Sequence, residues 1–172
     1  RNALCEIISG ISYDYEGVVE IKGNSYSFKD SEKQQITQRR KVGYLPSVIS
    51  LYKDMTVYEI LDFVGNAKKI SSEKKYKQIK EAVELVGLDA YKDVLVSKLT
   101  LWQTKRAVMA MALLGNPDVI VLNEPFGGLD RSATEDFRSL LKMLGGVKCV
   151  ILATSNADSI EDICKNVAIV VD

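Results

Sequence analysis

Residues 119–125 read Val-Ile-Val-Leu-Asn-Glu-Pro, and this stretch decides the fold. Its four consecutive apolar residues, 119–122, are typical of a strand that is buried on both faces, as in a parallel sheet. Ligands of parallel α/β sheets bind where the strands end. The polar pair Asn123 and Glu124 directly after this run is therefore the first place to look for function.

Strands and helices alternate on the C-terminal side of that run. Ser132 and Glu135 have the spacing of a capping box, which predicts a helix continuing to residue 144. A strand is expected over 150–152, a helix over 157–164 and a final strand over 167–171. Strand, helix, strand, helix, strand implies right-handed crossovers, so the fold class is α/β with a parallel sheet.

The first two thirds of the chain predict shorter elements. Strands are expected over 18–21 and 41–45, and apolar residues at spacings of three and four predict helices. The expected helices cover residues 4–10, 30–40, 56–65, 71–87 and 102–114.

Composition and charge narrow the class of protein. The chain has 172 residues, 47% of them apolar, which is enough for one domain with a sizeable core. Lys plus Arg and Asp plus Glu number 23 each, so no overall field draws the chain to nucleic acid or to an anionic membrane. No stretch approaches the ~20 apolar residues of a membrane span, and the start lacks the pattern of a signal peptide. If the protein acts at a membrane, we expect it to do so from outside the bilayer.

Cysteine and histidine usage points to a reducing compartment and limits the chemistry. Cys5, Cys149 and Cys164 are far apart in apolar surroundings, which predicts buried thiols in the cytosol. The chain has no histidine, which excludes an imidazole base or metal ligand.

A lysine-rich stretch follows the helix predicted over 56–65. It is either a basic contact surface or a solvated helix face. Its members are Lys68, Lys69, Lys74, Lys75, Lys77 and Lys80.

Polar side chains follow three of the predicted strands. Asn123 and Glu124 follow the first run, Thr154 and Ser155 follow 150–152, and Ser47 follows 41–45. Four apolar residues, an acidic position, Glu and Pro form a Walker B strand, where an Asp steadies hydrated Mg²⁺ and the Glu polarises water. The run at 119–125 has this form except for Asn123.

The remaining motifs lie, in this order, at 43–46, 51–59, 107–117, 121–125 and 128–130. Their order resembles that of the nucleotide-binding domain of ABC transporters. The resemblance covers nearly the whole chain. It implies a P-loop NTPase (RecA-like) sheet core, a single domain over 1–172, and an α-helical subdomain over 56–100. Residues 99–103 take the place of the signature motif. The glycine loop, its strand and the adenine-stacking aromatic are expected upstream of residue 1, so the domain is expected to lack its N-terminal strands.

Several functional positions depart from the family pattern. Arg1 replaces the Walker A lysine, Asn123 the Walker B aspartate, Ser47 the Q-loop glutamine and Ser155 the switch histidine. Trp102, like Leu101, replaces a signature glycine. By resemblance, Glu124 and Ser155 are the catalytic positions; Arg1, Asn2, Ala3, Ser47, Thr100, Trp102, Gln103, Asn123 and Asp130 are the nucleotide-binding positions; and Asn2, Ser47 and Asn123 are the metal positions.

These departures predict a degenerate ATP-binding subunit with weak binding or impaired hydrolysis. The resemblance implies ATP and Mg²⁺ as cofactors, a transmembrane permease and a second nucleotide-binding domain as partners, and a cytoplasmic location peripheral to the membrane. Nucleic acid is not expected as a partner. Two alternatives stay open: a nucleotide-independent scaffold or regulatory module with this fold, and an active ATPase with non-standard site residues. Soluble ABC ATPases of ribosomes or cluster assembly would share the pattern.

Overall fold

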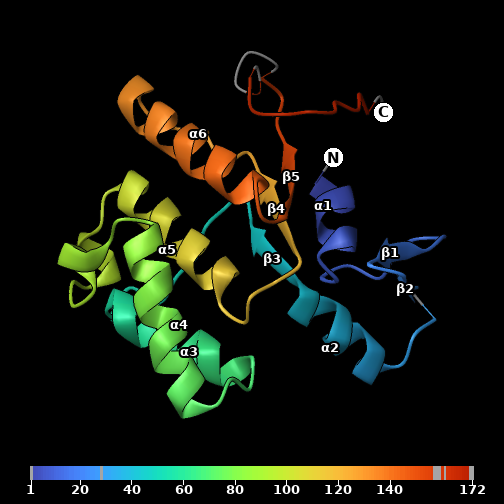
Figure 1. Cartoon of the computed structure of the whole chain (residues 1–172), viewed down its shortest axis with the longest axis horizontal. Coiled ribbons are helices and arrows are strands. Elements are labelled where there is room, and N and C mark those ends of the chain that lie inside the picture. The colour runs from blue at the N-terminus through green and yellow to red at the C-terminus, as the bar shows by residue number, and fades with distance from the viewer. Residues whose placement is uncertain (1, 28, 157–159, 161, 171–172) are drawn as a thin grey trace.

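Three parallel strands form the centre of the molecule (Figure 1). The computed structural model describes residues 2–27, 29–156, 160 and 162–170. The strands are β3 (Val42–Leu45), β4 (Val119–Asn123) and β5 (Cys149–Ala153), in the order β3-β4-β5. In the register of the sheet, β4 begins opposite the first residue of each neighbour. The predicted parallel α/β architecture is confirmed.

Strand β4 is buried along its whole length because helices cover both faces of the sheet. Val119 and Val121 pack in the smaller core with Cys5 of α1 (Asn2–Ile8). Ile120 and Leu122 point to the opposite face and join the larger core. Each such side chain contributes about 1.5–3 kcal/mol when it is removed from water.

Helices α5 (Leu101–Leu113) and α6 (Arg131–Gly145) contribute to the larger core. A Cβ at Gly43 would collide with the carbonyl oxygen of Ala112, so α5 approaches β3 as closely as only glycine allows. Phe137 of α6 is fully buried.

The helices between β3 and α5 pack against α5 as a group (Figure 1). They are α3 (Val57–Ala67), α4 (Ser72–Leu85) and two 3₁₀ turns, η1 (Asp89–Tyr91) and η2 (Val96–Lys98). Thr56 and Glu59 form a reciprocal capping box at the start of α3. The two ends of the segment meet where the Val96 N–H donates to Met55 O at 2.9 Å. No helix of the described residues is long and apolar enough to cross a bilayer.

A hairpin and a polar helix complete the N-terminal part. Strands β1 (Val19–Ile21) and β2 (Asn24–Tyr26) are antiparallel, and α2 spans Glu32–Lys41. Lys22 and Gly23 form the turn with φ of 49° and 72°, the left-handed pair that two-residue hairpins require. The expected helix over 30–40 is confirmed as α2, whereas β2 was not expected from the sequence.

Two elements expected near the C-terminus differ from the structure. Described residues 167–170 form no strand, and Ile169 is 87% exposed. An apolar run becomes a strand only where a neighbouring strand offers hydrogen bonds. Of the helix expected over 157–164, residues 157–159 and 161 lie outside the described residues, and none of the remaining four is α-helical.

The expectation of three buried thiols was wrong for two of them. Cys5 is buried, but Cys164 is partly exposed and Cys149 is exposed. Cys149 is the first residue of β5, which pairs with β4 on one side only among the described strands. A residue at the start of such an edge strand has fewer neighbours to cover it.

The lysine-rich stretch divides into two kinds of residue. Lys69, Lys74, Lys77 and Lys80 are exposed. The Lys68 ammonium donates to Leu114 O at 2.5 Å and to Met111 O at 3.3 Å, and burial lowers the pKa of Lys68 to about 8. Lys75 pairs with Asp62. Lys68 and Lys75 therefore tie helices together and belong neither to a contact surface nor to a freely solvated face.

Candidate functional site

The carboxyl ends of β4 and β5 bring Glu124 together with Thr154 and Ser155. The Thr154 hydroxyl donates to Glu124 Oε2 at 3.1 Å. The Ser155 backbone N–H and hydroxyl both donate to Glu124 Oε1, at 2.8 and 3.0 Å. The Glu124 carboxylate thus accepts three hydrogen bonds from the segment that follows β5.

The backbone of Glu124 is fixed as tightly as its side chain. Its φ of 49° lies in the left-handed region, and its N–H donates to Ala153 O at 2.8 Å. Lys105 of α5, only 4% exposed, donates to Glu124 O at 3.2 Å and to Pro125 O at 2.7 Å. Burial lowers the pKa of Lys105, and the Glu124 charge raises it. Lys105 could not be predicted from the sequence, because nothing in the residues around a helix lysine indicates that its side chain is buried.

Asn123, which the resemblance predicted at the Walker B aspartate position, is buried and only 1% exposed. Its amide nitrogen donates to Asn2 Oδ1 of α1 at 3.1 Å. Its Oδ1 is buried and has no hydrogen-bond partner in the described part of the chain. Ala3, next to Asn2, is exposed, and Arg1 lies outside the described residues.

These oxygens fit a magnesium site poorly. Mg²⁺ prefers hard oxygen ligands and usually takes at least one carboxylate from the protein. Asn2 and Asn123 offer only neutral amide oxygens, and Ser47 lies exposed beyond the end of β3. Among the described residues, no three Cys, Asp or Glu side chains gather as a metal-binding group.

The residues predicted to take the place of the signature motif make structural interactions at the start of α5. Thr100 caps the helix, and the Gln103 side chain accepts from the Thr100 N–H at 2.9 Å. The Trp102 ring packs edge-on against Phe137 at 5.3 Å between centroids, and the Arg106 guanidinium lies 4.1 Å from its centre. The Trp102 indole is thereby held between α5 and α6.

The remaining motif positions lie between β4 and α6. A Cβ at Gly128, whose φ is 75°, would meet the Leu101 side chain at 2.8 Å, so this turn contacts the start of α5. Asp130 caps α6 by accepting from the Ala133 N–H at 2.8 Å. The N-terminal ends of helices α5 and α6 therefore both lie next to the turn that follows Glu124.

The family model for "ABC transporter" matches residues 2–127, which is most of the chain. The chain belongs to the ABC transporter family. The order of motifs read from the sequence and the P-loop NTPase type of α/β fold agree with this assignment.

Curated ABC transporter relatives match almost the whole chain. An ABC transporter ATP-binding protein of Methanocaldococcus jannaschii is 28% identical over 98% of this chain and 58% of its own length. The methionine import ATP-binding protein MetN 1 of Enterococcus faecalis is 28% identical over 98% of this chain and 48% of its own length. The chain spans about half the length of these relatives.

Solved ABC cassettes share the fold. A dimeric ATP-binding cassette in a post-hydrolysis state with ADP and Pi superposes with a TM-score of 0.78 at 24% identity, covering 91% of this chain and 70% of the other. The cbiO1 protein of Clostridium perfringens, part of the ABC transporter complex cbiONQ, gives a TM-score of 0.79 at 24% identity, covering 94% of this chain and 65% of the other.

Proposed function

We propose that this chain is an ATP-binding subunit or domain of an ABC transporter whose own nucleotide site is degenerate. It binds ATP weakly or hydrolyses it poorly, and it works with a transmembrane permease and a second cassette. The relatives named as import ATP-binding proteins support a transport role. The dimeric cassette among the structural neighbours supports a paired arrangement.

The observation that carries the proposal is the engagement of Glu124. A general base needs a free lone pair within hydrogen-bond reach of the water that it activates. Glu124 Oε1 already accepts two bonds from Ser155, and Oε2 accepts one from Thr154. These bonds fill three of the about four acceptor positions of a carboxylate, so Glu124 serves as the anchor of the segment after β5 and has little capacity left to accept a proton from water.

Asn123 supports the same conclusion from the metal side. A neutral amide at this buried position supplies no charge to hold a hydrated Mg²⁺. Loss of one positioned group in phosphoryl transfer commonly costs ~100-fold in rate, although such losses do not add. We therefore expect slow turnover even where ATP binds.

Trp102 extends the defect to the partner's site. In the proposed head-to-tail pair, the start of α5 faces the partner's nucleotide. A glycine there would let backbone N–H groups approach phosphate closely. Trp102 instead carries an indole that packs on Phe137, so both composite sites are impaired.

The permease is proposed to dock on the exposed apolar surface beside α3, which is formed by the Q-loop region after β3 and by the α-helical subdomain over 56–100. Val48 is 81% exposed, Tyr52 66% and Phe63 51%, and the rings of Tyr52 and Phe63 meet edge-on at 6.0 Å. Exposed apolar groups that cluster in this way mark interaction surfaces. Such docking would place the protein at the cytoplasmic face of a membrane.

The docking proposal is tested by co-purification of the full-length protein with its permease. We expect Phe63→Ser to lose the permease, since the change removes the ring that packs on Tyr52. Tyr76→Ser is the matched control, because Tyr76 is an aromatic residue of the same helical group and is 64% exposed. Equal recovery of permease with both variants would refute the docking surface.

The nucleotide proposal is tested by Mg²⁺-ATP binding and turnover of the full-length protein beside Glu124→Gln. Weak binding, or binding with turnover that Glu124→Gln leaves unchanged, is the expected result. Tight binding with turnover that the variant abolishes would make the protein an active ATPase.

The scaffold alternative is favoured by the neutral pair Asn2 and Asn123, which bond to each other where the family holds its metal. It predicts no stabilisation by nucleotide, whereas a ligand at about 100 times its Kd would add about 2.7 kcal/mol to the free energy of unfolding.

A further inference from the structure

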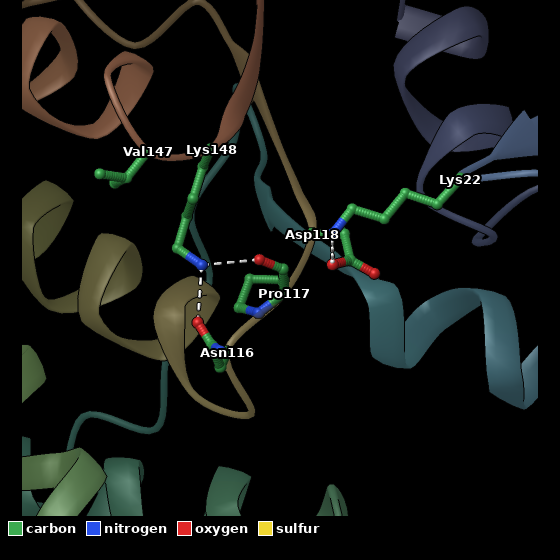
Figure 2. Close-up of a pocket in the computed structure, with 6 residues that line it drawn as sticks. All are labelled: Lys22, Asn116, Pro117, Asp118, Val147 and Lys148. Carbon is green, nitrogen blue, oxygen red and sulfur yellow. Dashed lines mark hydrogen bonds and ion pairs between the residues drawn. The ribbon is translucent and has the colours of Figure 1, made fainter.

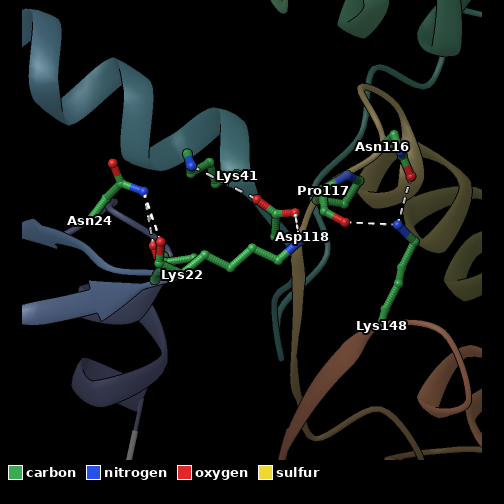
Figure 3. Close-up of polar contacts among 8 residues, drawn as sticks. Lys22, Asn24, Lys41, Asn116, Pro117, Asp118 and Lys148 are labelled. Carbon is green, nitrogen blue, oxygen red and sulfur yellow. Dashed lines mark hydrogen bonds and ion pairs between the residues drawn. The ribbon is translucent and has the colours of Figure 1, made fainter.

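Charged side chains from four segments gather at the amino-terminal ends of β4 and β5 (Figure 3). Lys22 of the hairpin turn bonds to Asp118 Oδ1 at 2.6 Å, and Lys41 at the end of α2 lies 4.0 Å from Asp118 Oδ2. Lys148, just before β5, approaches from the other side. Asp118, directly before β4, thus has a lysine near each of its two carboxylate oxygens.

The cluster carries more positive than negative charge. The Lys148 ammonium donates to Asn116 Oδ1 at 2.7 Å and to Pro117 O at 2.8 Å, and both acceptors are uncharged. Three lysines thus surround one carboxylate, an excess of two positive charges. Burial lowers the pKa of Lys148, the Asp118 charge raises it, and the Lys22 charge lowers it again. A further anion would relieve the repulsion between the lysines.

A cavity of about 300 Å³ lies at this cluster (Figure 2). Lys22, Asp118 and Lys148 line it together with Asn116, Pro117 and Val147. An ammonium has three protons, and the two bonds of Lys148 to neutral oxygens use two of them. The volume is at the small end of ligand pockets, which suits an ion or a small molecule.

We infer that this cavity binds a small polyvalent oxyanion of the phosphate class between Lys22 and Lys148. Lys22, Lys148 and Asp118 give the cavity lining one excess positive charge, and Lys41 beside Asp118 adds a second, so the field favours a polyvalent anion over a monovalent one. Asp118 holds Lys22 in place, while Asn116 and Pro117 fix Lys148. The site is separate from Glu124, since the six steps along the chain from Asp118 to Glu124 extend about 20 Å at ~3.3 Å per residue.

The inference is tested by NMR titration of the full-length protein with inorganic phosphate near neutral pH, against sodium chloride of equal ionic strength. We expect saturable shifts of the Asn116, Asp118 and Lys148 amides, with no matching change at Glu124 and Ser155. Shifts that sodium chloride reproduces, or shifts only around Glu124, would overturn the inference. A parallel titration with glycerol phosphate separates two sources: binding of both ligands indicates the phosphate end of a larger molecule, and binding of phosphate alone indicates the free ion.

Matched variants test the role of Lys148. Lys148→Met is expected to weaken phosphate binding about tenfold or more, because one charge-assisted hydrogen bond is lost. Lys148→Arg, which keeps the charge, should retain most of the affinity. Lys98→Met removes an exposed lysine elsewhere and should change nothing. Equal affinity of Lys148→Met and Lys98→Met, with both variants folded by their amide spectra, would contradict the inference.

Discussion

The two ends of β4 each have a carboxylate next to them, and the side-chain and backbone groups that bind these carboxylates differ in charge. At the carboxyl end, Glu124 accepts from the uncharged donors of Thr154 and Ser155. At the amino end, Asp118 lies among Lys22, Lys41 and Lys148. Phosphate chemistry needs positive charge, and in the described part of this chain the lysines surround the carboxylate at the end that carries no family motif. The family motif therefore indicates where the site is expected, but it does not ensure that the site carries the positive charge that binds phosphate.

The largest effect on stability is expected from Gly43→Ala in β3, the strand that pairs with β4. The added Cβ would strike the Ala112 carbonyl and push α5 away from β3. We expect the free energy of unfolding to fall by about 3 kcal/mol in urea denaturation followed by circular dichroism. Gly145→Ala is the control, because a Cβ there meets no atom within 4 Å. Similar stability of the two variants would show that β3 and α5 separate easily.

The next largest effect is expected from Asn123→Asp, which restores the family's carboxylate at the neutral end. A carboxylate at a position that is 1% exposed should lower the free energy of unfolding by about 2 kcal/mol at neutral pH. Added Mg²⁺ should recover part of the loss. Urea denaturation with and without Mg²⁺ measures both effects, and the exposed Asn166→Asp is the control. A variant as stable as the wild type would mean that a negative charge at position 123 does not destabilise the fold.

A smaller effect is expected from Ser155→Ala, which removes one of the bonds to Glu124. The hydroxyl is lost while the backbone N–H remains, so the cost should be about 1 kcal/mol or less. The amide of residue 155 should exchange faster with deuterium as the segment loosens. Ser139→Ala, whose hydroxyl bonds only within its own helix, should not change that rate. An unchanged rate in Ser155→Ala would indicate that Thr154 and the backbone suffice.

The smallest effect is expected from Lys22→Met at the positive end. The Lys22 side chain is 70% exposed, so its pair with Asp118 should contribute less than about 1 kcal/mol and weaken with salt. The hydrogen bond from Lys22 holds the pKa of Asp118 below its ordinary 3.8. The contribution is therefore present above pH 3.8 and lost as pH falls through the lowered pKa. Denaturation at several pH values should show the difference from wild type vanish in acid, with Lys98→Met as the control. A difference that is constant with pH would mean that Asp118 is not the partner.

The sequence predicted the elements that depend on local pattern. The apolar run of β4 and the periodic spacing in α3 and α5 each favour one structure strongly, and the structure confirms them. The rule that polar residues after parallel strands gather at one edge directed attention to Glu124 and Ser155, which the structure brings into contact. The roles of these residues stay predictions.

The long-range contacts of single charged residues were not predictable from the sequence. Lys68 and Lys105 resemble solvated helix residues, and only the packing of neighbouring helices shows that each caps buried carbonyls. The Asp118 carboxylate accepts a hydrogen bond from Lys22, which is 96 residues away in the sequence. The strand expected over 167–171 fails in its described part for the related reason that a strand depends on its neighbours.

The position of Trp102 gives the molecule a built-in optical reporter. It is the chain's single tryptophan, and its ring lies against Phe137 of α6 and under Arg106 of α5. Its emission wavelength therefore depends on the contact that its ring makes with Phe137 of α6. Any ligand or partner that shifts α5 against α6 will be visible in the intrinsic fluorescence of the unlabelled protein.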